Sequence, residues 1–178
     1  MLIGLVSAAA LLLAAAGLAK LRRRTPLRSA FAAAAVPGLA RLPAGAATRL
    51  AGTVELVVGL VALAVGGRLG ALLLAAVYAA LTGLTVRMMA IEAGQDCGCF
   101  GRPGPVSHWH TGVNLAGLLI GLAGVALPAG SLPAEIGRQP VSGLALGLAA
   151  ALLAYLGYLT MTALPALRSA MAELEPVR

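Results

Sequence analysis

Charged and aromatic residues are scarce in this chain of 178 residues, and each shortage excludes a class of protein. Only 11% of the residues are charged and 3% are aromatic, while 60% are hydrophobic. Soluble domains contain about 25% charged and about 45–50% apolar residues, so this composition excludes an ordinary soluble globular protein. The chain still has a net charge of +7. Because most of the basic residues gather in one connection between apolar segments, they indicate membrane topology and anionic headgroups, and we expect no nucleic-acid partner.

Several motifs of soluble enzymes are also missing. The sequence contains no glycine-rich phosphate loop, no serine triad and no paired catalytic carboxylates. Its two cysteines do not form the Cys-x-x-Cys pattern of four-ligand zinc sites, so no structural metal site is predicted.

Long apolar runs dominate what remains. Uncharged apolar runs of about 18 or more residues predict transmembrane helices. We therefore expect an all-α integral membrane protein, with a four-helix transmembrane bundle as its core and a fifth span. Residues 1–178 form a single membrane domain in this interpretation, with spans at about 2–20, 50–66, 69–89, 111–127 and 141–164.

Local patterns refine this outline. The charges of the first run follow its apolar core, which favours a retained span over a signal peptide. Residues 26–36 could form an amphipathic interfacial helix or an ordinary loop, and a turn is expected over 128–140. Gly117-x-x-x-Gly121 with Gly124 predicts a small-residue face on the fourth span, and Gly143-x-x-x-Gly147 predicts one on the fifth.

The basic residues predict the orientation in a cell (inner) membrane. Seven of them lie between Lys20 and Arg49, and with five spans the same side also receives Arg87, Arg102, Arg168 and Arg178. Only Arg68 and Arg138 fall on the other side. The positive-inside rule therefore predicts a multi-pass protein with its N-terminus outside, and with its C-terminus and its cysteine loop on the cytoplasmic side.

The segment richest in chemistry is the loop over 91–110, which holds both cysteines of the chain, Cys97 and Cys99. Disulfide geometry needs Cα atoms about 4.4–6.8 Å apart, which residues i and i+2 reach only in bent backbone. Gly98 permits that bend. The resulting ring would be strained and would exchange easily. His108 could stabilise a thiolate, whereas Asp96 would oppose it.

Three functions compete on these residues. In the first, Cys97 and Cys99 are the catalytic pair of a thiol–disulfide oxidoreductase, and a quinone could reoxidise them within the bilayer. In the second, a small transporter or soft-metal-binding protein uses the cysteines with His108, His110 or Glu55. In the third, the chain is a passive assembly subunit whose cysteines form a local clip or remain unreactive.

A few polar residues within the spans could support such a site. Glu55 would lie inside the membrane, where carboxylates mark a proton path, a substrate site or a pair, here with Lys20. His110 and Asn114 share one helix face and could hydrogen-bond to the cysteine loop. With Trp109 they could instead be interfacial anchors.

The hexapeptide Asp96-Cys97-Gly98-Cys99-Phe100-Gly101, placed between the third and fourth spans, resembles the signature of the methylamine utilisation protein MauE family, within the DoxX-like group. Gly17-Leu18-Ala19-Lys20-Leu21-Arg22 and Val54-Glu55-Leu56 are weaker matches, and the likeness covers roughly 2–125.

This resemblance implies a four-helix core and a redox-associated role in methylamine metabolism. It implies maturation of disulfide-rich proteins such as the small subunit of methylamine dehydrogenase, beside a thioredoxin-like partner. Carried over residue by residue, the six positions from Asp96 to Gly101 form the site.

Overall fold

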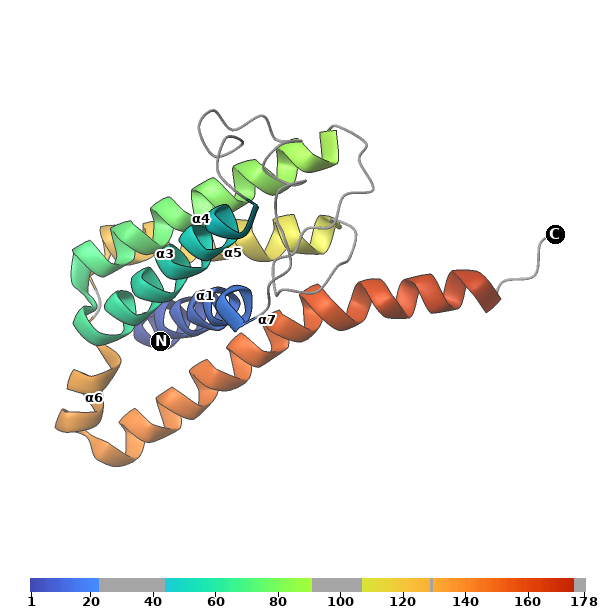
Figure 1. Cartoon of the computed structure of the whole chain (residues 1–178). Coiled ribbons are helices and arrows are strands. Elements are labelled where there is room, and N and C mark those ends of the chain that lie inside the picture. The colour runs from blue at the N-terminus through green and yellow to red at the C-terminus, as the bar shows by residue number, and fades with distance from the viewer. Residues whose placement is uncertain (23–43, 91–106, 129, 175–178) are drawn as a thin grey trace.

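The computed structural model describes residues 1–22, 44–90, 107–128 and 130–174. These residues contain six helices and no strand, which confirms the all-α fold class. Figure 1 shows them as a bundle flanked by one long helix. In chain order the helices are α1 (Leu2–Arg22), α3 (Ala44–Val65), α4 (Gly67–Ala90), α5 (His108–Ala126), α6 (Leu132–Arg138) and α7 (Pro140–Leu174).

Five of these helices are long and apolar enough to cross a membrane. Helices of about 20 apolar residues match the hydrocarbon thickness of a bilayer. Many large apolar side chains point outward, such as Leu119, Leu148 and Leu152, as expected for surfaces that face lipid. The candidate spans are Leu2–Arg22, Gly45–Val65, Gly67–Ala90, His108–Ala126 and Pro140–Leu164.

Helices α1 and α3 pack closely because small residues line both of them. A methyl group added at Gly17 would come within 2.5 Å of the carbonyl oxygen of Gly52, and one at Gly59 within 2.7 Å of the carbonyl oxygen of Ala10. Such close backbone approach is typical of small-residue contacts between membrane helices. This contact brings the end of α1 against the first half of α3.

Helices α4 and α5 form a second close pair, through the small-residue face predicted for the fourth span. A methyl group at Gly121 would lie 2.8 Å from the backbone nitrogen of Ala75, and one at Gly117 would lie 2.6 Å from the ring of Tyr78. Gly124 continues the same face. The prediction for this face is therefore confirmed.

The turn between α3 and α4 contains Gly66 and Gly67, whose φ angles of 62° and 63° favour glycine. Because this turn is tight, α3 and α4 run in opposite directions side by side (Figure 1). The end of α4 therefore lies at the same end of the bundle as the start of α3.

The turn expected over 128–140 contains a short helix, α6. Ser131 caps it by accepting a hydrogen bond from the backbone nitrogen of Ala134 at 3.3 Å. A methyl group at Gly143 would lie 2.5 Å from the Cα of Ile136, so the small face at the start of α7 packs on α6. The glycine spacing in the fifth span thus marks a contact with a surface helix.

Helix α7 crosses beside α1 and extends past the bundle towards the C-terminus (Figure 1). Met161 packs with Leu12 and Ala16 of α1. The helix continues ten residues beyond the predicted end of the span at Leu164.

Candidate functional site

The cysteine motif lies in the connection between α4 and α5. All six motif residues, from Asp96 to Gly101, belong to 91–106 and lie outside the described residues, as does the segment 26–36. The structure does describe the helices that flank this connection, and these fix where it leaves and re-enters the bundle.

The two flanking helices are joined at the ends that carry the connection. Thr111, in the first turn of α5, donates a hydrogen bond from its hydroxyl to the sulfur of Met89, in the last turn of α4, at 3.3 Å. The connection between Ala90 and His108 is 17 residues long and begins and ends at this end of the α4–α5 pair.

The start of α5 is organised around His110. Its Nδ1 lies 2.9 Å from the hydroxyl oxygen of Ser107 and accepts a longer hydrogen bond, of 3.3 Å, from the backbone nitrogen of Ser107. His110 is buried, whereas His108 and Trp109 are exposed. The two histidines therefore face different surroundings, and they do not form one ligand pair at the helix start.

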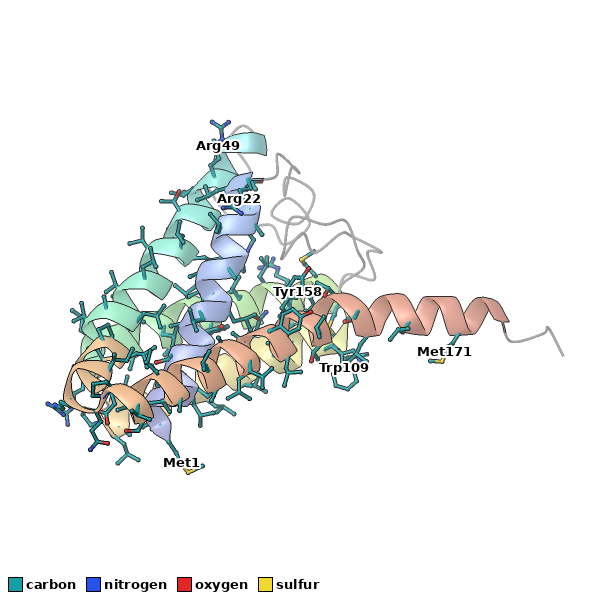
Figure 2. All side chains as sticks on the ribbon, turned by 90° about the horizontal axis from the view of Figure 1, so that it is seen from below. Met1, Arg22, Arg49, Trp109, Tyr158 and Met171 are labelled. Carbon is teal, nitrogen blue, oxygen red and sulfur yellow. The ribbon has the colours of Figure 1, made fainter. Side chains whose placement is uncertain are left out.

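Asn114 lies one turn after His110 and is 3% exposed. Both residues face inward on α5. Their shared face was predicted, but their burial places them in the bundle and not among exposed interfacial residues. Trp109, at 39% exposed, keeps a position suited to an interfacial anchor (Figure 2).

Lys20 and Glu55 form a buried ion pair between α1 and α3. The ammonium nitrogen of Lys20 lies 2.5 Å from each carboxylate oxygen of Glu55, and the two residues are 5% and 3% exposed. The pair with Lys20, one of the roles considered for Glu55, is confirmed. Two opposite charges that hydrogen-bond to each other are tolerated inside a membrane bundle where one alone is costly.

Tyr78 provides a further polar link between the helix pairs. Its hydroxyl donates a 2.8 Å hydrogen bond to the carbonyl oxygen of Ala9 on α1, and its side chain is buried. Tyr78 belongs to none of the motifs described above. Because aromatic residues are rare in this chain, the presence of a tyrosine within a predicted span could have pointed to Tyr78.

Lys20, Tyr78 and Asn114 all line one small cavity, which sequence reasoning missed. Its volume is about 20 Å³, and α1, α4, α5 and α7 all contribute to it. Its remaining walls are apolar: Leu12, Leu13, Ala16, Leu81 and Met161. The structure therefore brings three polar residues from three helices, Lys20, Tyr78 and Asn114, to one place in the bundle.

Basic residues mark the end of the bundle that carries the cysteine connection. Arg22 and Arg49 lie together at one end, and Met1 lies at the other (Figure 2). Arg87 stands in the last turn of α4, which ends on the Arg49 side. Among the described residues, no three His, Cys, Asp or Glu side chains gather into a metal-binding group.

Comparison with known proteins gives one match. The model of the family described as methylamine utilisation protein MauE matches residues 1–128, which include α1, α3, α4, α5 and the cysteine connection. No curated protein and no solved structure matched the chain.

Proposed function

Because the chain belongs to the methylamine utilisation protein MauE family, we propose that it is the membrane thiol–disulfide exchange component of that process, acting through Cys97 and Cys99. The observation that carries the proposal is the Cys97-Gly98-Cys99 motif, the only cysteines of the chain, within the matched region. Family membership and five apolar helices support the coarser statement, a multi-pass membrane protein of methylamine utilisation.

The proposed step exchanges one disulfide for another. A thiolate of the substrate protein attacks one sulfur of the Cys97–Cys99 disulfide, which breaks that bond and forms a mixed disulfide. A second substrate thiolate then attacks the mixed disulfide, closes the substrate's own disulfide and releases both cysteines as thiols. A thioredoxin-like partner in its disulfide form restores the pair by the same two steps, and is itself reduced.

The structure supports this role through the frame around the loop. The hydrogen bond between Thr111 and Met89 holds together the ends of the two helices from which the loop departs. His110 lies buried at the base of the loop, bonded to Ser107. Cys97 and Cys99 are separated by one residue in the sequence, so the proposed pair needs no further cysteine. The substrate class proposed is a disulfide-rich protein such as the small subunit of methylamine dehydrogenase.

The positions of the charges support a cytoplasmic location for the loop. The helix ends on the loop side carry Arg22, Arg49 and Arg87, and this excess of basic residues favours the cytoplasmic face. With the loop on the cytoplasmic side, a partner on the outer side could reach the cysteines only if the loop dipped into the bilayer. A cytoplasmic thioredoxin-like protein would meet it directly.

The experiment is differential alkylation of the intact protein in sealed vesicles. Before reduction, we expect the protein to gain no alkyl group, because both cysteines are held in the disulfide. After reduction, it should gain two, one on each cysteine. Cys97→Ser and Cys99→Ser should each have one free thiol before and after reduction. An impermeant reagent applied to right-side-out and inverted vesicles then assigns the side. Cysteines that stay free under oxidising conditions, or serine variants that keep full exchange activity, would refute the proposal.

A further inference from the structure

The cavity at the junction of α1, α4, α5 and α7 has more hydrogen-bond donors than the protein satisfies. The amide nitrogen Nδ2 of Asn114 is buried and has no hydrogen-bond partner among the described residues. The ammonium group of Lys20 has three N–H bonds, and the two oxygens of Glu55 account for two of them. Both residues line the cavity.

Tyr78 supplies the complementary group on the same cavity. Its hydroxyl proton is directed at the carbonyl oxygen of Ala9, so the hydroxyl oxygen retains lone pairs that can accept. The polar residues that line the cavity therefore offer two donors and one acceptor, and its other walls are apolar. Buried polar groups in proteins nearly always find partners, and ordered water is a frequent one.

Charge and size restrict what the cavity can hold. The ion pair of Lys20 and Glu55 sums to zero charge, so the site gives no net attraction to an ion. Methylammonium has only donors and cannot accept from Asn114 or Lys20. A volume of about 20 Å³ exceeds the roughly 10–15 Å³ that one water molecule needs.

We propose that this cavity is a binding site for a single internal water molecule, which accepts from Lys20 and Asn114 and donates to Tyr78. Internal waters of this kind make two to four hydrogen bonds and are part of the structure. The site joins the α1–α3 pair, which holds the ion pair, to the α4–α5 pair, which carries the cysteine connection. This inference does not depend on the proposed redox function.

Two methionines make a matched test by radiolytic footprinting in ¹⁸O-labelled water. Hydroxyl radicals formed from a bound water oxidise the side chains beside it. Met161 lines the cavity, whereas Met88 does not, and the two are similarly buried at 5% and 1% exposed. We expect Met161 to gain labelled oxygen several-fold faster than Met88 in the intact wild-type protein.

The variant Asn114→Leu removes one donor and fills the space with an apolar group. We expect it to reduce the oxidation of Met161 to the rate of Met88, with the Met88 rate unchanged. Equal, slow oxidation of both methionines in the wild-type protein would show a dry cavity and overturn the proposal. The comparison of Met161 with Met88 in the wild-type protein tests the proposal even where Asn114→Leu fails to fold.

Discussion

The ion pair between Lys20 and Glu55 makes the sharpest energetic prediction. Both side chains are at least 95% buried and each carboxylate oxygen lies 2.5 Å from the ammonium nitrogen. Removal of one partner leaves the other charge buried without a counterpart. We therefore expect Lys20→Met and Glu55→Leu each to lower the free energy of unfolding by about 3–5 kcal/mol. This corresponds to a loss of roughly two to four powers of ten in the folding equilibrium.

The double variant should behave differently from either single one. Replacing both charges by apolar side chains of similar volume removes the cost of desolvation together with the attraction, so the change is expected to be close to neutral or stabilising. The double variant should thus recover most of the stability that each single substitution loses.

Reversible unfolding in mixed detergent micelles would measure these effects. Trp109 is the only tryptophan of the chain and gives a fluorescence signal. Arg68→Met, at an exposed charge, is the matched control and should change the free energy of unfolding by less than about 0.5 kcal/mol. Single variants within about 1 kcal/mol of wild type, or a double variant as unstable as the two losses added, would refute the reasoning.

Two further predictions concern the contacts between helices. Gly121→Leu forces a side chain against the backbone of Ala75 and should destabilise the α4–α5 pair by about 1–3 kcal/mol. Gly83→Ala is the control, because a methyl group there meets open space and should not destabilise the pair. Equal melting temperatures for the two variants would contradict this packing. Tyr78→Phe removes the hydrogen bond to Ala9 and should cost about 0.5–1.5 kcal/mol in the same unfolding assay, and a gain in stability would argue against that bond.

The fold was largely predictable because it depends on features that are local in the sequence. Uncharged runs identify the spans, and the glycine spacing of the fourth span identifies its packing face. The short helix α6 was not predicted because it is a single capped segment without an apolar run. Its signal was Ser131 followed by Pro133 in the first turn, a common way for a helix to begin.

The site was predictable only in part. The pairing of Lys20 with Glu55 could be foreseen because each is an isolated charge at a similar depth in neighbouring spans. The position of Lys20 and Asn114 on one cavity could not be foreseen, because it requires α5 to pack against α1 across the bundle. Gly52 and Gly59 were also missed, although their spacing of seven residues places them on one face of α3.

Helix α7 is longer than the hydrocarbon layer of a bilayer is thick. At about 1.5 Å per residue, its 35 residues extend about 52 Å, against about 30 Å for the hydrocarbon of a bilayer. It starts beside α6 and finishes past the opposite end of the bundle, well clear of the other spans (Figure 2). A fluorescent protein fused behind α7 would therefore report which side of the membrane the α4–α5 connection faces.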